Sequence, residues 1–86
     1  MKSTSLAKRL GSLIRHFRLE VGISQEEFAD RCGLHRTYIG SIERGEKTIT
    51  IETARKIAQA LGIPLSSIFL ELERLEAEQH DHNDNN

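Results

Sequence analysis

The chain has few of the residues that cross-link a fold or bind metals. It contains one cysteine, no tryptophan and one tyrosine among 86 residues. A single cysteine excludes an internal disulfide framework, and no Cys or His residues fall at the spacing of a zinc site. No apolar run has the length of a signal peptide or a membrane span. We therefore expect a cytoplasmic protein with no metal, no cofactor and no association with membranes.

The length and the low aromatic content bound the fold. Apolar residues make up 37% of the chain and aromatic residues only 5%, so a single modest core must come mainly from Leu, Ile and Ala. The sequence also lacks a phosphate-cradling glycine loop and a nucleophile with a base beside it. We read Cys32 as a small core residue. These absences argue against an enzyme.

The charge is unevenly distributed along the chain. Residues 1–62 carry eleven Lys and Arg against seven Asp and Glu, a net charge of +4, whereas residues 63–86 have a net charge of −5. A mildly basic front with an acidic tail suits a domain that binds a polyanion while its tail stays away from the ligand.

Apolar residues recur at helical spacing through most of the chain and predict an all-α fold of five helices. The first spans about residues 5–20, the second and third lie between residues 24 and 45, the fourth follows Thr50, and the fifth follows Pro64. We expect residues 1–5 to be flexible, residues 6–78 to form one domain, and residues 79–86 to be a disordered acidic tail.

The second and third helices are short and are separated by a tight turn. Ser24 is a good N-cap, Glu27 stands three residues later as in a capping box, and Gly33 suits the left-handed position after a helix. Gly45 closes the third helix, which opens with Arg36. This spacing is typical of a helix-turn-helix that places its second helix in the DNA major groove.

The same stretch resembles the helix-turn-helix domain of the phage Cro/C1 repressors, the lambda repressor-like or Xre family. The residues that carry the resemblance are Ser24-Gln25-Glu26-Glu27, Cys32-Gly33, Ile42-Glu43-Arg44-Gly45 and Ala58-Gln59-Ala60-Leu61-Gly62-Ile63. Within that family, Arg36-Thr37-Tyr38-Ile39 followed by Ile42-Glu43-Arg44 is similar to the controller proteins of restriction–modification systems.

The resemblance assigns roles to individual residues. It implies base contacts by Arg36, Thr37 and Ser41, and backbone contacts by Gln25, His35, Tyr38, Arg44, Lys47 and Thr48. Arginine offers a fork that matches guanine, and threonine can hydrogen-bond or pack on a thymine methyl. Tyr38 has a second interpretation, packing on the preceding helix. Arg18 and Glu43 are implied to form a structural ion pair between the first and third helices.

The apolar stripe of the fifth helix has two interpretations. Its residues are Leu65, Ile68, Phe69, Leu72 and Leu75. Leu65 and Ile68 can complete the core of the monomer, but the stripe is longer than a small core needs, so we assign it to a homodimer interface. The predicted function is a homodimeric, sequence-specific transcriptional regulator that binds a pseudo-palindromic site on double-stranded DNA. RNA polymerase or another protein is a further candidate partner, and the alternative is a protein-interaction module such as an antitoxin.

Overall fold

The computed structural model describes the backbone of residues 5–84 and the side chains of residues 5–78. Five helices follow one another, and no strand occurs in this part of the chain: α1 (Leu6–Val21), α2 (Gln25–Cys32), α3 (Arg36–Glu43), α4 (Ile51–Leu61) and α5 (Leu65–Asp84). The predicted all-α fold of five helices is confirmed. None of the helices within the described residues is long and apolar enough to cross a membrane.

Local signals set the boundaries of α2 and α3. The Ser24 hydroxyl accepts a hydrogen bond from the backbone N–H of Glu27 at 3.0 Å and starts α2. Gly33 has a φ of 70° and ends it, because a left-handed residue costs glycine no clash with a Cβ. His35 then caps α3 with its ring, since Nδ1 accepts from the N–H of Thr37 at 3.2 Å.

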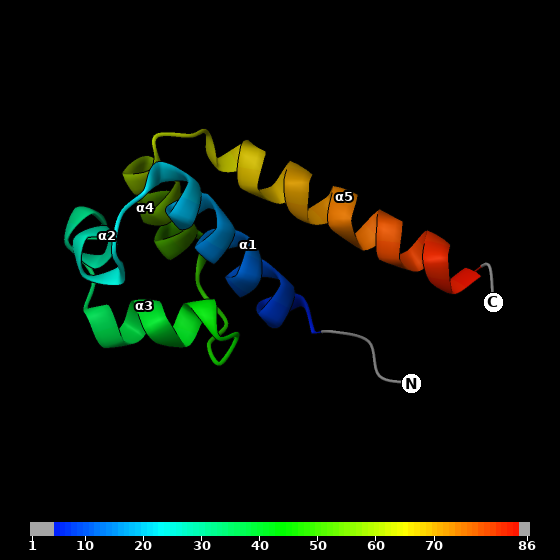
Figure 1. The fold of residues 1–86 in the computed structure, drawn as a ribbon, viewed down its shortest axis with the longest axis horizontal. Helices are drawn as coiled ribbons and strands as arrows, with labels where there is room; N and C mark the ends of the chain where they lie inside the picture. The colour runs from blue at the N-terminus through cyan, green and yellow to red at the C-terminus, as the bar shows by residue number, and fades with distance from the viewer. Residues whose placement is uncertain (1–4, 85–86) are drawn as a thin grey trace.

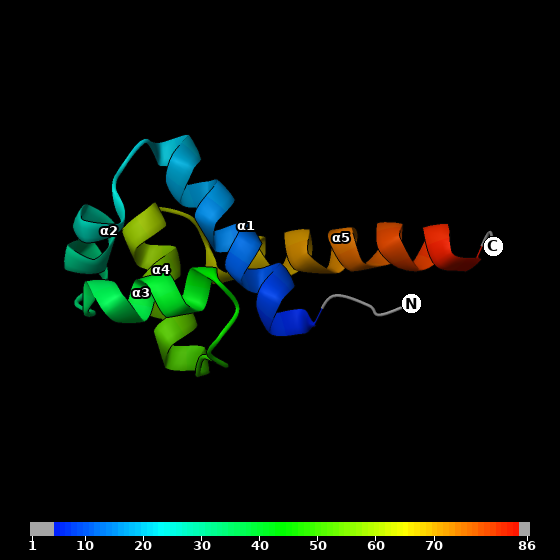
Figure 2. The same ribbon diagram turned by 60° about the horizontal axis from the view of Figure 1, so that its bottom comes forward.

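The first four helices enclose the core, and α5 packs on α1 and α4 before it extends away from the body (Figures 1 and 2). The largest fully buried side chains come from all five helices: Ile14, Phe28, Ile39, Ile42, Ile57 and Ile68. The core is therefore aliphatic with one central phenylalanine, as the composition predicts.

Helices α1 and α3 approach each other closely at Gly11. A Cβ built on Gly11 would lie 2.2 Å from the carbonyl oxygen of Ile42 and 2.8 Å from that of Glu43. Only glycine fits at this crossing, so the backbones of the two helices touch with no side chain between them. The end of α3 is thereby fixed against the middle of α1.

The two ends of the chain differ from expectation. Ser5, assigned to a flexible N-terminus, caps α1 by accepting from the N–H of Lys8 at 3.1 Å; residues 1–4 lie outside the described residues. The predicted disordered tail begins at residue 79, yet α5 is helical to Asp84. No Gly or Pro follows Pro64 in the sequence, so nothing stops the helix there. Residues 85–86 are again outside the described part.

Candidate nucleic-acid interface

The orientation of α3 is fixed by a buried ion pair at its C-terminal end. Arg18 on α1 donates from Nε to Oε2 of Glu43 at 2.7 Å and from Nη2 to Oε1 at 3.1 Å. A third bond runs from Arg18 Nη1 to the carbonyl oxygen of Ile23 at 2.9 Å. Gln25, the first residue of α2, donates from Nε2 to Oε1 of Glu43 at 2.9 Å. The ion pair implied by the resemblance is therefore present, and it joins three helices.

The first turn of α3 is exposed to solvent. Arg36 and Thr37 lie at the surface, and Nη1 of Arg36 is 3.7 Å from Oε1 of Glu26 on α2. His35 is also exposed. Because its Nδ1 accepts the capping bond, the neutral ring carries its proton on Nε2, which remains available as a donor. This turn thus presents an arginine fork, a hydroxyl and an imidazole N–H together.

Gln25 and Arg44 meet beside Gly40 on α3. A Cβ on Gly40 would lie 3.1 Å from Nη1 of Arg44 and 3.7 Å from Oε1 of Gln25. Arg44 is exposed, and its guanidinium also bonds Glu46 through two hydrogen bonds of 2.9 and 3.2 Å. The structure therefore brings together two of the residues predicted to contact phosphates. Both lie on the side of α3 where Gly40 has no side chain.

Two residues of α3 are less available than expected. Ser41, predicted to contact a base, is 9% exposed, and its hydroxyl donates to the carbonyl oxygen of Thr37 at 3.1 Å. A serine one turn along a helix commonly bonds back in this way, so its position does not support base reading. Tyr38 is half-buried and packs against the core. A packing role therefore fits it, although the predicted partner was the preceding helix alone.

The segment after α3 carries further polar groups. Lys47 and Thr48 are exposed. Sequence reasoning missed Lys8, whose Cα and Cγ would each lie 2.5 Å from a Cβ on Gly45. This contact places a lysine of α1 directly beside the turn that follows α3. The sequence held no signal for it, because Lys8 and Gly45 are brought together only by the crossing of α1 and α3.

The apolar residues assigned to a dimer interface divide into two groups. Ile68 is 1% exposed and Leu72 is 6% exposed, so both belong to the monomer core, and their burial does not support their assignment to a dimer interface. Their burial arises because α5 packs closely on α1 and α4. Leu65, Phe69 and Leu75 are partly buried and pack at the edge of the core.

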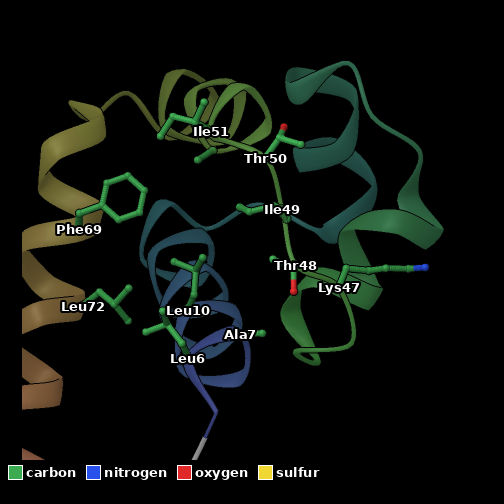
Figure 3. Close-up of a pocket in the computed structure, with 11 residues that line it drawn as sticks. Leu6, Ala7, Leu10, Lys47, Thr48, Ile49, Thr50, Ile51, Phe69 and Leu72 are labelled. Carbon is green, nitrogen blue, oxygen red and sulfur yellow. The ribbon is translucent and has the colours of Figure 1, made fainter.

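Phe69 faces an apolar hollow of about 290 Å³ between α1, α5 and the segment before α4 (Figure 3). Leu6, Leu10, Ile49 and Ile51 contribute to its lining, while the Lys47 side chain points away from it. Leu6 and Ile51 are both largely exposed. An apolar face therefore exists, but it is centred on this hollow and not on the whole stripe of α5.

Cys32 is buried at the end of α2, as predicted for a core residue. Burial raises the pKa of its thiol from 9.0 to about 11, against a smaller lowering by the charge of Lys56. Such a thiol is a poor nucleophile at neutral pH. Within residues 5–78, no group of three His, Cys, Asp or Glu side chains is placed to hold a metal ion.

Comparison with known proteins places this arrangement in a family. The sequence profile of the helix-turn-helix family matches residues 14–68, which contain α2, α3, α4 and the buried ion pair. The chain belongs to the helix-turn-helix family. The control protein C.BamHI of Bacillus amyloliquefaciens is 44% identical over 54 residues, covering 62% of this chain and 67% of that protein. Control protein C.MunI of a Mycoplasma species is 39% identical over 67 residues, covering 77% and 90%.

Solved helix-turn-helix structures agree with these sequences. The controller protein C.AhdI from Aeromonas hydrophila has a TM-score of 0.70 and 35% identity, covering 73% of this chain and 94% of that one. C.Esp1396I bound to a 25 base pair operator site has a TM-score of 0.76 and 32% identity, covering 84% and 95%. The resemblance to Cro/C1-type regulators, and to controller proteins among them, is thus confirmed.

Proposed function

We propose that the protein is a transcriptional regulator that binds a specific site on double-stranded DNA through α3. The observation that carries the proposal is the exposed first turn of a helix whose other end is fixed by Arg18 and Glu43. Because its C-terminal end is fixed and its first turn is exposed, this short helix can enter the major groove in one orientation. The operator complex of the similar protein C.Esp1396I supports this proposal. The regulatory relatives favour a role other than catalysis.

We assign the contacts with DNA bases to Arg36 and Thr37. The Arg36 fork can donate two hydrogen bonds to O6 and N7 of a guanine, and Thr37 can bond or pack on a neighbouring base. Ser41 is removed from this role because its hydroxyl is already used within α3. Glu26 lies near enough to Arg36 to orient the guanidinium before DNA arrives.

We expect contacts with the DNA backbone to surround the first turn of α3. Gln25 stands at the N-terminus of α2, where unpaired N–H groups favour a phosphate. We assign further phosphate contacts to Nε2 of His35 and to Arg44, Lys47 and Thr48, all exposed. Lys8 joins them because it adjoins Gly45. Tyr38 keeps a contact only through its hydroxyl, since its ring packs on the core.

We further propose that the protein acts as a homodimer on a pseudo-palindromic operator. The apolar hollow lined by Phe69, with exposed Leu6 and Ile51 at its edge, offers a surface for a second copy. Two-fold pairing would present two α3 helices to successive major grooves, about 34 Å apart. A cytoplasmic location and a contact with RNA polymerase remain predictions that accompany this role.

Selection of bound duplexes from a random pool tests the proposal. We expect the unaltered protein to enrich one sequence with two related half-sites. Arg36→Ala should weaken binding to that sequence by about 1–3 kcal/mol and relax the preference at one base pair of each half-site. Arg55→Ala, an exposed arginine on α4, is the matched control and should leave the preference unchanged. A pool without enrichment would refute sequence-specific binding.

A further inference from the structure

Arg44 occupies an unusual position for a residue assigned to a phosphate. Its guanidinium folds back over α3 at Gly40, where a Cβ would come within 3.1 Å of Nη1. The opposite edge of the same guanidinium donates from Nε to Oε2 of Glu46 at 2.9 Å and from Nη2 to Oε1 at 3.2 Å. The group is therefore held between a glycine and a carboxylate on the surface that faces DNA in the proposed complex.

The turn after α3 creates this pairing. Gly45 has a φ of 76°, and the N–H of Glu46 donates to the carbonyl oxygen of Ser41 at 2.9 Å. The chain thereby reverses and returns the Glu46 side chain to Arg44, two residues earlier. Both side chains remain exposed, so the pair adds little to the stability of the fold. Its effect is on the charge that DNA meets.

The pair is ionised at neutral pH. The hydrogen bond from Arg44 lowers the pKa of the Glu46 carboxyl, and the same bond raises the pKa of Arg44. The two charges cancel, so the cation assigned to a phosphate contact is neutralised in the free protein. Glu46 occupies the Nε and Nη2 edge, which is one of the two edges that can form a two-bond fork, and Nη1 lies against α3 at Gly40. A phosphate that binds the occupied edge must therefore displace Glu46.

We propose that Glu46 is a specificity-determining residue that competes with DNA phosphates for Arg44. On non-target DNA, replacing the Glu46 carboxylate on Arg44 by a phosphate brings little gain in binding free energy. The freed carboxylate then lies near the phosphates and is repelled by them. On the operator, base contacts by Arg36 and Thr37 hold α3 in one register, in which one phosphate takes the place of Glu46 on Arg44 and the freed carboxylate keeps one position away from the DNA backbone. Non-target DNA fixes no such register, so the repulsion remains there. Glu46 therefore weakens binding to non-target DNA more than binding to the operator. This inference rests on the proposed function.

The test compares Glu46→Gln with the unaltered protein, because glutamine keeps the shape and removes the charge. Affinity is measured by fluorescence anisotropy for the selected operator and for a scrambled duplex of equal length, over a range of salt concentrations. We expect affinity for the scrambled duplex to rise about fivefold and affinity for the operator to rise less than about twofold. The salt slope on the scrambled duplex should steepen by about one per bound protomer, since one more phosphate is neutralised.

A matched control separates this effect from net charge. Glu78 is also exposed and also bonds an arginine, Arg74, on α5, which packs on α1 and α4 and has no close packing with α3. Glu78→Gln changes the net charge equally and should leave the ratio of the two affinities unaltered. In an Arg44→Ala background, Glu46→Gln should change that ratio by less than half as much.

The results decide between the alternatives. An unchanged ratio in Glu46→Gln, an equal change in Glu78→Gln, or a full effect without Arg44 would each overturn the inference, while operator selection by the unaltered protein would still support the proposed function. If the unaltered protein binds both duplexes equally, the proposed function fails and this inference fails with it.

Discussion

Arg18 and Glu43 form a two-bond ion pair between the last turn of α1 and the last residue of α3, with both side chains almost fully buried. Gln25 adds a third donor to the same carboxylate. A buried carboxylate that satisfies donors from two other helices sets the angle of α3 relative to the body of the domain. The proposed reading surface therefore depends on a residue that never faces DNA.

Replacing Glu43 tests this dependence. Glu43→Ala leaves the Arg18 charge buried without its partner, and we expect a loss of about 3–5 kcal/mol in the free energy of unfolding. Urea denaturation followed by circular dichroism measures it. Glu27→Ala is the control, because Glu27 pairs with Arg31 at the surface and should cost less than about 1 kcal/mol. Equal losses in the two variants would contradict the structural role of Glu43.

Gly11 offers a test in which two physical effects have opposite signs. Helix propensity alone predicts that Gly11→Ala stabilises α1 by up to about 1 kcal/mol. The contact of its Cβ with the carbonyl oxygen of Ile42 predicts a loss of about 1–3 kcal/mol, because two backbones would have to separate. We expect the loss, read as a lower Tm. Ser12→Ala, one residue later and exposed, should leave Tm nearly unchanged; a rise in Tm for Gly11→Ala would refute the crossing.

The proposed dimer surface is tested by three aspartate substitutions. Ile51 is 63% exposed beside the apolar hollow, and Leu70 is 65% exposed but does not line it. Ile51→Asp should raise the dimer dissociation constant at least about tenfold, since a charge would be buried between copies. Leu70→Asp should leave it unchanged. Sedimentation velocity measures both.

The third substitution separates assembly from folding. Leu72 is 6% exposed in the monomer, so Leu72→Asp should abolish the helical circular dichroism signal instead of releasing a folded monomer. A folded Leu72→Asp monomer would return this residue to the interface. An unaltered protein that is monomeric at micromolar concentration would refute the dimer itself.

Cys32 gives a prediction about chemistry. Burial raises the pKa of its thiol to about 11, above its ordinary value of 9.0, so the thiol stays protonated as the pH rises to 9 and beyond. At pH 8 its reaction with a soluble disulfide reagent should be on the order of 100-fold slower than in the unfolded protein, from the thiolate fraction alone. The measurement is absorbance of the released thiol with and without denaturant. Equal rates would show that Cys32 is accessible.

The sequence predicted the helices well because their ends depend on neighbours in the chain. Ser24 with Glu27 and Thr50 with Thr53 each form a cap within three residues, and both caps are observed. The polar composition after residue 78 predicts disorder, whereas α5 continues to Asp84. A helix without Gly or Pro continues when nothing interrupts it.

The site was harder to predict wherever a role depends on packing. Ser41 shares a helical face with Thr37, but spacing does not reveal that its hydroxyl bonds back to the helix. Periodicity likewise grouped Leu72 with Phe69, although only the contact with α1 and α4 buries one more than the other. The pairing of Arg44 with Glu46 needs the conformation of Gly45, which the sequence suggests only as a turn.

The bare contact between Gly11 and the end of α3 bears on how such a protein diverges. Peptide groups hold α3 in place at that point, and peptide groups are the same whatever side chains the outer face carries. Arg36 and Thr37 can therefore be exchanged for other residues without disturbing the packing of α3 against α1. In this fold, a new target sequence can be acquired by changing a few exposed residues while the contacts between α1 and α3 stay the same.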